Sequence, residues 1–365
     1  MDNEELEQQT PKEPVWKKIL LVIGRIFAVL VVIVLLLAAV LYGVMFVLAK
    51  GPSPTARDLF VRSVQETSAV GFLARLYFSQ EEIDRITGAD AEVVYQEMDS
   101  SLIQLPDPTA PTEDPEKGPV PDEWGLIDED GDGIILEKVQ GEGFSGFMMV
   151  VRDPSRVIMG SVPSSYGKRG YTVAEMVKKF DAVAGINAGG FYDPGGQGNG
   201  SIPETMVVYE GKIYYEANGI RDGFAGFDSN HILHVGKFTA DQVRERDIQY
   251  GVCFGPVLVV NGKAVDPSSL GSGVNPRTAI GQRSDGAVLL LVIDGRQVSS
   301  LGATYQDLVD VMLSYGAVNA CNLDGGSSTM MWFEGDYINN CASVVGIRPV
   351  PTSFLVLKEE VAGDE

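Results

Sequence analysis

A long run of apolar residues lies near the start of the chain. Residues 26–49 contain no charged side chain and are rich in Leu, Val and Ile. At about 1.5 Å per residue, a helix of this length crosses a hydrocarbon core of about 30 Å with some tilt. The pattern predicts a transmembrane helix at 26–49 after a short tail at 1–25. A cleaved signal peptide is the alternative, because Val47-Leu48-Ala49 resembles a cleavage site, but the run exceeds the usual h-region of about 7–15 residues.

The basic residues that flank this run are divided almost evenly: Lys12, Lys17, Lys18 and Arg25 precede it, and Lys50, Arg57 and Arg62 follow it. The positive-inside rule therefore does not decide the orientation. A short tail without an apolar core, followed by a large C-terminal part, fits a signal anchor. We expect a single-pass protein of the cytoplasmic membrane, with a cytoplasmic N-terminal tail and an extracellular C-terminal domain.

After the span the pattern becomes helical and then polar. Apolar residues recur at helical spacings over 55–87, and Ser79 with Glu82 makes a capping box, so we expect a helical stalk at 55–95 that acts as a spacer. Six prolines lie among Asp, Glu and Thr between Leu105 and Trp124. This composition favours extended backbone and cannot build a core, which predicts an acidic, Pro-rich linker at 96–124.

The remainder, 125–358, alternates short β-rich runs with glycine turns and ends in an acidic tail at 359–365. Two hairpins and two capped helices are predicted: hairpins at 206–215 and 257–265, the second with a type I′ turn at Asn261-Gly262, and helices that Thr172 with Glu175 and Thr304 with Asp307 begin. Strands that outnumber scattered helices indicate a mixed α+β domain.

Composition narrows the classes of function. The chain has 365 residues, 45% of them hydrophobic, and a formal net charge of −22. That apolar content supports one large core, and the negative charge argues against a nucleic-acid partner, which would require a basic surface.

Cysteine and histidine give little sign of a metal site. Cys253, Cys321 and Cys341 form no CxxC pair; a Cys321–Cys341 disulfide and three free thiols are both compatible with the spacing. His231 and His234 fall in a strand-like run that points them to opposite faces. We therefore expect no metal and no cofactor.

An acidic motif at residues 128–133 reads D-x-D-x-D-G, the first half of a calcium-binding loop. The second half is missing, because Val139 stands where the loop requires a bidentate Glu. The motif is interpreted as an acidic turn into a strand.

Three apolar runs end in a carboxylate or carboxamide that small residues follow: Asn187 before Gly189-Gly190, Asp294 before Gly295, and Asp324 before Gly325-Gly326-Ser327-Ser328. A strand end is a rigid mount, and glycine lets a ligand approach the backbone. Taken singly, each pair is also typical of a simple turn.

Two of these features suit an anion. The two glycines and three hydroxyls of residues 325–329 exceed what a turn requires and could present several donors. Arg277, between Pro276 and Thr278, carries a guanidinium suited to bidentate contact with phosphate or carboxylate, although a structural salt bridge would also explain it. Acid–base chemistry would fall to carboxylates, because no Ser-His-Asp set is assembled.

These motifs resemble the boxes of the phosphodiester glycosidase family, in the same order, over roughly 141–357. The five matching segments are 187–191, 254–256, 276–281, 294–296 and 322–330. The first has Ala188 inserted into the family's Asn-Gly-Gly-Phe box, and the last has one glycine fewer than the common Asp-Gly-Gly-Gly-Ser form.

The resemblance implies hydrolysis of the bond between an anomeric carbon and a phosphodiester oxygen, in a glycan or cell-envelope polymer. It implies a site in which Arg277, Thr278 and the loop of Gly325, Gly326, Ser327 and Ser328 stabilise the phosphate. Asp294 and Asp324 are then the candidates for nucleophile or base. Asn187, with Gly189 and Gly190, is expected to contact the sugar.

Two other classes remain open. One is a non-catalytic module that binds an envelope polymer through the same pocket. The other is a subunit of a polysaccharide-assembly complex, held through an apolar patch on the helical stalk. Whether the carboxylates and Arg277 share one cavity separates the first alternative from the enzyme. The oligomeric state does not follow from the sequence.

Overall fold

The structure is a computed structural model. It describes residues 15–67, 69–88, 95–105, 119–196, 198–215, 223–266, 272–343 and 346–359. The chain divides into two compact units, Met1–Arg57 and Asp58–Glu365.

The first unit contains one long helix, α1 (Val15–Lys50). The helix includes the predicted span and extends about three turns N-terminal to it, across Lys17, Lys18 and Arg25. The central residues are apolar on all sides and exposed, as in a helix surrounded by lipid. Among the described residues, α1 is the one helix with the length and composition to cross a membrane.

Three short helices follow: α2 (Pro54–Gln65), α3 (Phe72–Arg75) and α4 (Gln80–Thr87). Residues 58–88, the helical segment of the second unit, carry the buried side chains Val61, Ala74, Ile83 and Ile86. The predicted capping box is present, because the Ser79 and Glu82 side chains each accept from the other's backbone N–H.

In the described part of the chain, seventeen strands form three antiparallel sheets. The first sheet has the order β1 (Ile134–Gly141), β2 (Phe144–Val151), β13 (Val288–Ile293), β12 (Arg277–Arg283), β14 (Ala317–Leu323), β10 (Val257–Val260) and β11 (Lys263–Ala264). The second has the order β16 (Asp336–Tyr337), β15 (Met331–Phe333), β4 (Ala182–Asn187), β17 (Thr352–Leu357) and β3 (Val157–Ser161). The third has the order β6 (Lys212–Tyr215), β5 (Val207–Tyr209), β9 (Ile248–Phe254), β7 (Gly223–Asp228) and β8 (Leu233–Gly236).

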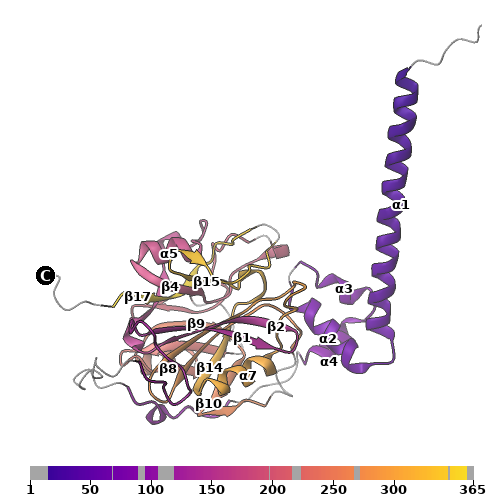
Figure 1. Cartoon of the computed structure of the whole chain (residues 1–365). Helices are drawn as coiled ribbons and strands as arrows, with labels where there is room; N and C mark the ends of the chain where they lie inside the picture. The colour runs from indigo at the N-terminus through magenta and orange to yellow at the C-terminus, as the bar shows by residue number, and fades with distance from the viewer. Residues whose placement is uncertain are drawn as a thin grey trace, which may run out of the picture. The chain divides into compact units, whose positions relative to one another are not determined.

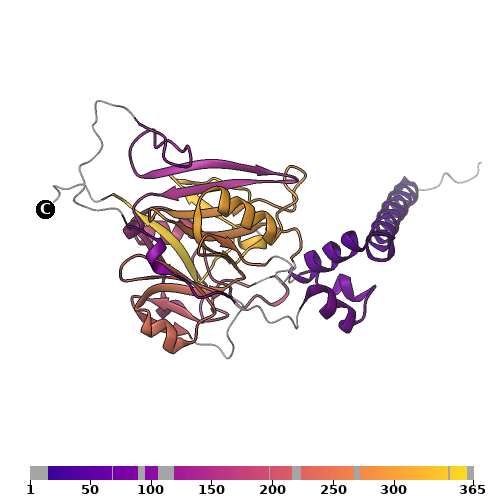
Figure 2. The ribbon, with the colours of Figure 1, turned by 90° about the horizontal axis from the view of Figure 1, so that it is seen from below.

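One short helix packs on each sheet. The helices are α5 (Val173–Lys179) on the second sheet, α6 (Ala240–Glu245) on the third and α7 (Tyr305–Ser314) on the first. Figure 1 shows α5 beside β4 and β15, and α7 beside β14 and β10. Figure 2 shows the β1–β2 hairpin along the edge of the first sheet.

The central strand β13 explains this layering. Its alternate residues Leu289, Leu291 and Ile293 pack in the cluster that contains Leu308, Val309 and Met312 of α7. The intervening residues Val288, Leu290 and Val292 pack in the common core, where inner faces of all three sheets meet. A strand buried on both faces reads as a continuous apolar run, as residues 288–293 do. The predicted mixed α+β class is confirmed.

Several elements that local sequence signals predict are present in the domain. Both predicted hairpins form, as β5–β6 and β10–β11, and the second turns through left-handed Asn261 and Gly262. Thr172 and Thr304 cap α5 and α7. The sequence analysis missed α6, although Thr239 with Gln242 forms a third capping box.

The segment predicted as a linker differs from that expectation at both ends. Met98 packs against the common core, as does Tyr95 just before the predicted linker, and Ile103 is buried. Near the other end, the guanidinium of Arg283 stacks over the Trp124 ring at 3.8 Å. Because apolar side chains lie among the prolines, both ends of this segment can pack against the domain. Residues 106–118 lie outside the described residues.

Candidate active site

Strand ends bring the predicted motifs together. Asn187 ends β4, and its amide nitrogen donates to the Asp324 carbonyl (2.5 Å). Its amide oxygen accepts from the Thr278 hydroxyl (2.9 Å) and the Met330 N–H (3.0 Å). The Asp324 N–H donates to the Ala188 carbonyl (2.9 Å). The end of β4 therefore fixes the backbone of Asp324 through both of its peptide groups.

A cavity of about 1230 Å³ opens in front of this loop. Six of the predicted site residues line it: Arg277, Asp324, Gly325, Gly326, Ser327 and Ser328. Arg277 and Asp324, which the sequence separates by 47 positions (324 minus 277), thus share one cavity. The helical segment forms part of the cavity wall, through residues 62–67, 69–70, 80, 83–84 and 87–88.

Five other predicted residues are not among those that line the cavity: Asn187, Gly189, Gly190, Thr278 and Asp294. Asn187 and Thr278 are fully buried and bonded to each other. The Gly189 N–H donates to the Thr352 hydroxyl, and a β-carbon on Gly190 would lie 2.9 Å from the Phe254 ring. The structure therefore places these residues beneath the cavity, where they support its floor.

Asp294 lies at the end of β13 and is 5% exposed. Its carboxylate accepts from the Asn339 amide (3.2 Å) and from the backbone and side-chain nitrogens of Asn340 (2.9 and 3.3 Å). Those bonds hold the loop after β16 against the end of the first sheet. The sequence could not distinguish this arrangement from a carboxylate that faces a ligand.

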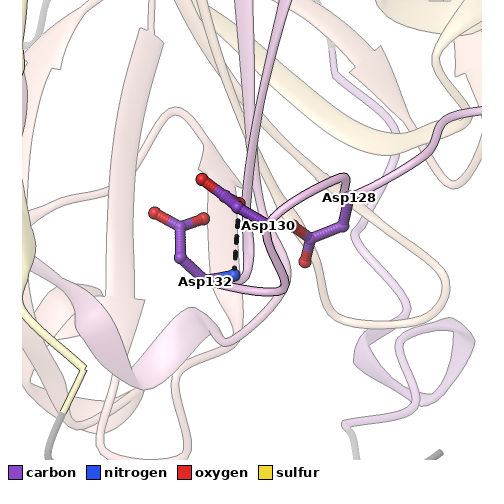
Figure 3. A group of neighbouring side chains, drawn as sticks. All are labelled: Asp128, Asp130 and Asp132. Atoms are coloured by element: carbon purple, nitrogen blue, oxygen red, sulfur yellow. Dashed lines mark hydrogen bonds between the residues drawn. The ribbon is translucent and has the colours of Figure 1, made fainter. Parts of the chain in front are cut away.

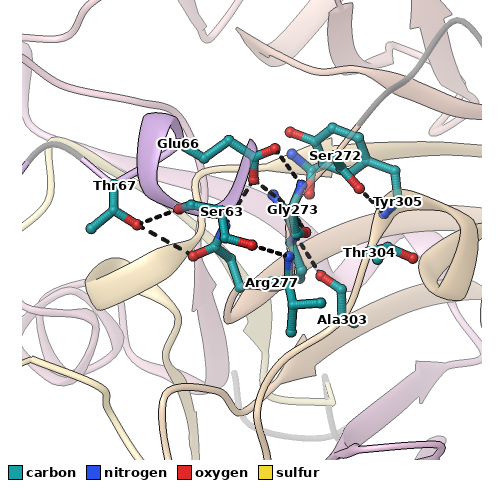
Figure 4. A network of polar contacts seen from close by, with 12 residues as sticks. Ser63, Glu66, Thr67, Ser272, Gly273, Arg277, Ala303, Thr304 and Tyr305 are labelled. Carbon is teal, nitrogen blue, oxygen red and sulfur yellow. Dashed lines mark hydrogen bonds and ion pairs between the residues drawn. The ribbon is translucent and has the colours of Figure 1, made fainter. Parts of the chain in front are cut away.

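Arg277 is held on several sides (Figure 4). Its guanidinium donates to the carbonyls of Ala303 (3.0 Å) and Gly273 (2.7 Å) and lies over the Tyr305 ring at 4.2 Å. It also pairs with Glu66 at 2.6 Å. Burial alone would lower the pKa of Arg277, but the charge of Glu66 raises it above its ordinary value. The side chain is positively charged and fixed in direction.

The loop after Asp324 turns through a 3₁₀ helix, Gly326–Ser328. The Gly326 N–H donates to the Pro276 carbonyl and the Ser328 N–H to the Gly325 carbonyl, so two of the predicted backbone donors are already used. Gly326 has φ 62°, and a β-carbon on Gly325 would lie 2.7 Å from the Pro276 carbonyl. Glycine at both positions allows this close approach.

The sequence analysis missed two arginines of the cavity wall. Arg296 follows Asp294-Gly295 and donates to Asn275 (3.1 Å) and Thr67 (2.8 Å). Burial and the nearby charge of Arg277 lower its pKa. Arg348 donates to the Ser327 hydroxyl (2.8 Å) and lies in a buried position. The Asp-Gly-Arg box pointed to Arg296, whereas no local signal distinguished Arg348.

Carboxylates also line this wall. Asp193 pairs with Arg348 at 2.6 Å, and Glu204 lies beside Gly190, whose β-carbon would be 3.1 Å from a Glu204 carboxylate oxygen. Both residues line the cavity together with Asp324. Arginines and carboxylates thus line one cavity, an arrangement that can bind an anion and activate water beside it.

The acidic motif lies apart from this cavity (Figure 3). Oxygens of Asp128, Asp130 and Asp132 lie within 4.8 Å of one another, close enough for a single cation. Asp128 accepts from two glycine N–H groups at 3.0 Å, and Asp132 accepts from Ile134, the first residue of β1. Burial and the neighbouring carboxylates raise the pKa of Asp132 despite that bond. The predicted acidic turn into a strand is confirmed.

The cysteines and histidines are not among the residues that line the cavity. Cys253, Cys321 and Cys341 are all free thiols, and the Cys341 thiol donates to the carbonyl of Ser327 in the cavity wall (3.4 Å). His234 bonds to Asp228 at 3.0 Å, and His231 lies in the preceding turn with φ 61°, so the strand predicted through both begins only after His231.

Comparison with known proteins finds the family that the sequence motifs resemble. Residues 180–357 match the Phosphodiester glycosidase family. This stretch contains every residue that the sequence analysis proposed for the site.

Two individual proteins are similar to the chain. The chain is 34% identical over 191 residues to the SPbeta prophage-derived uncharacterized protein YomE of Bacillus subtilis (strain 168), a match that covers 50% of this chain and 29% of that protein. The chain thus spans under a third of the curated relative's length. In fold it is similar to the zebrafish N-acetylglucosamine-1-phosphodiester alpha-N-acetylglucosaminidase catalytic domain auto-inhibited by pro-peptide. That match has a TM-score of 0.51 and 19% identity, and it covers 62% of this chain and 82% of that one.

Proposed function

We propose that the protein is a membrane-anchored, extracytoplasmic hydrolase that cleaves a sugar-1-phosphodiester in a glycan or cell-envelope polymer. The observation that carries this proposal is that Asp324 and Arg277, both in the family match, line one cavity. The bond cleaved would be the one between the anomeric carbon and the phosphodiester oxygen.

The charges of the cavity suit the leaving group. A phosphate monoester departs without strong protonation, so the transition state gains more from fixed positive charge than from a general acid. Arg277, Arg296 and Arg348 supply that charge from the start of β12 and from two loops, and internal hydrogen bonds hold each guanidinium in place. Ser327, which bonds to Arg348, brings the loop after Asp324 into the same wall.

Two carboxylates are the candidates for the attack on carbon. We assign Asp324 as nucleophile or water-activating base, because its backbone is fixed and it lines the cavity. Glu204 takes the place of Asp294 as the second carboxylate, since it lines the same cavity. Asp294 and Asn187 become positioning residues that hold the loops of the site.

The test is release of sugar from a panel of glycosyl-1-phosphodiesters by the full chain in detergent micelles. Asp324→Asn keeps the shape and removes the charge, so turnover should fall at least about tenfold, or ~1.4 kcal/mol of transition-state stabilisation. Asp241→Asn is the matched control, because Asp241 is 87% exposed on α6. Sugar release by a folded Asp324→Asn variant at the wild-type rate would remove Asp324 from catalysis and favour a substrate-binding role for the loop at residues 324–329.

The proposed topology rests on α1, whose length and composition fit a membrane span. With the N-terminus inside, protease added to intact cells should remove the large domain. Full protection of that domain behind an intact membrane would contradict the extracytoplasmic placement. A mature protein that begins at Lys50 would instead show that the helix is a cleaved signal.

A further inference from the structure

A short part of the helical segment, residues 63–67, contacts Arg277 and Arg296 of the candidate site, and Figure 4 shows Glu66 beside Arg277. Glu66 is at its centre. One carboxylate oxygen accepts from the Gly273 N–H (2.8 Å), and the other accepts from the Asn275 amide (2.9 Å) and the Arg277 guanidinium (2.6 Å). Three donors from one loop and strand thus converge on a single anion.

Two flanking contacts have the same polarity. The Ser63 hydroxyl accepts from the Val274 N–H (2.9 Å), and the Thr67 hydroxyl accepts from Arg296 (2.8 Å). In these five bonds residues 63–67 supply the acceptor and the glycosidase domain supplies the donor, whereas a longer contact runs the other way, from the Thr67 hydroxyl to the Asn275 amide oxygen (3.4 Å). The donors of the domain therefore form a cradle for an anion that also carries neutral oxygens.

The cradle does not depend on Glu66 for its shape. Arg277 keeps its direction through the carbonyls of Ala303 and Gly273 and the face of Tyr305. Asn275 is anchored by backbone bonds in both directions with Ala303. Removing the carboxylate would leave preformed donors and two guanidinium groups, of which Arg277 is close enough to lower the pKa of Arg296.

A phosphate group presents the oxygens that this cradle binds, and it cannot occupy the cradle beside a second anion. We propose that Gly273, Asn275, Arg277 and Arg296 form the phosphate subsite of the cavity and that Glu66 occupies this subsite as a competing carboxylate. The inference rests on the proposed function for its substrate, a sugar-1-phosphodiester. It makes residues 63–67 a reversible occupant of the site, in place of the passive spacer that the sequence suggested.

Docking of residues 63–67 is close but consists mainly of polar contacts. A β-carbon on Gly273 would lie 2.2 Å from the Ser63 backbone, so glycine is required where the two segments meet. Glu66 itself remains 24% exposed, and its contacts face a solvent-accessible cavity. Hydrogen bonds of this kind exchange with a ligand at low net cost, because each donor gains a new acceptor.

The experiment measures binding of inorganic phosphate to the full chain in detergent micelles by titration calorimetry. Glu66→Ala and Glu66→Gln should each lower the Kd for phosphate at least about tenfold relative to the wild type, since the competing charge is gone. Glu81→Ala is the matched control: Glu81 is an exposed carboxylate of the same helical segment, outside the cavity lining. Its Kd should equal that of the wild type. Thermal unfolding of each variant verifies that it is folded.

A second variant locates the phosphate. Adding Arg296→Gln to Glu66→Ala should abolish the gain, because the subsite loses one of its two guanidinium groups. Phosphate binding no tighter in both Glu66 variants than in the wild type, or a gain that persists without Arg296, would overturn the proposal. The readout does not require hydrolysis. Tighter phosphate binding without sugar release from any substrate would therefore refute the proposed hydrolase and leave the subsite in place.

Discussion

Replacing Asn187 by Ala tests whether the end of β4 holds the catalytic loop. The amide makes three hydrogen bonds in a fully buried position, to the Asp324 carbonyl, the Thr278 hydroxyl and the Met330 N–H. Each is worth about 1 kcal/mol net, and its loss leaves a partner with one bond fewer in a water-poor environment. We therefore expect Asn187→Ala to lower the free energy of unfolding by about 3 kcal/mol. Turnover should fall at least about tenfold, because Asp324 loses one of its two backbone restraints.

Two further variants calibrate the loss of stability expected for Asn187→Ala. Thr278→Val removes one of the three bonds and keeps the volume, so it should cost about 1 kcal/mol. Asn230→Ala, at an exposed turn, should stay within about 0.5 kcal/mol of the wild type. Urea unfolding of the full chain in detergent gives the stabilities, and sugar release gives turnover. Equal costs for Asn187→Ala and Asn230→Ala would refute the argument, as would full activity in an Asn187→Ala protein that is destabilised as expected.

Two other predictions concern buried ion pairs. Arg283 is 1% exposed, pairs with Asp122 at 2.8 Å and stacks over Trp124. Arg283→Ala should therefore lower the free energy of unfolding in urea by about 3 kcal/mol. It should also expose Trp124, which a red shift of tryptophan fluorescence in the folded state would report. Burial on its own would raise the pKa of Asp228. The hydrogen bonds that its carboxylate accepts from His234 and from two backbone N–H groups outweigh this effect, so the pKa of Asp228 lies below its ordinary value. The stability that this carboxylate contributes is therefore present above about pH 4 and is lost as the pH falls through its lowered pKa. The difference in unfolding free energy between wild type and Asp228→Asn should narrow between about pH 5 and pH 3, and a difference that widens on acidification would contradict the assigned shift.

Much of the domain could be predicted because its signals are local. A capping box spans four residues, and an Asn-Gly pair between two β-rich runs specifies its own turn. Thr172, Thr304 and Asn261-Gly262 all act in this way in the structure. Arg277 and Asp324 were also found from the sequence, because a polar residue at the end of an apolar run is visible without the partner strand.

The roles within the site were less accessible, because they depend on contacts between distant segments. Glu66 and Arg277 are 211 positions apart, and no pattern near Glu66 distinguishes it from other helical carboxylates. Asp294 has the same local pattern as Asp324, yet its carboxylate oxygens bond to Asn339 and Asn340 and do not line the cavity. The direction of a side chain at a strand end depends on the loop that packs against it, and that loop cannot be identified from a single sequence.

The cooperative unit is larger than the stretch that matches the family. The match begins at residue 180, but β13 lies between β12 and β2, and β2 lies within residues 144–151. β17 likewise pairs with β3, within residues 157–161. Without these strands, both sheets would present new unpaired edges and lose Met149, Val151 and Met159 from the common core. The helical segment adds part of the cavity wall and the carboxylate on Arg277. The motifs of the candidate site therefore cluster in the matched stretch because strand ends carry them, while the fold and the walls of the cavity also depend on residues that precede it.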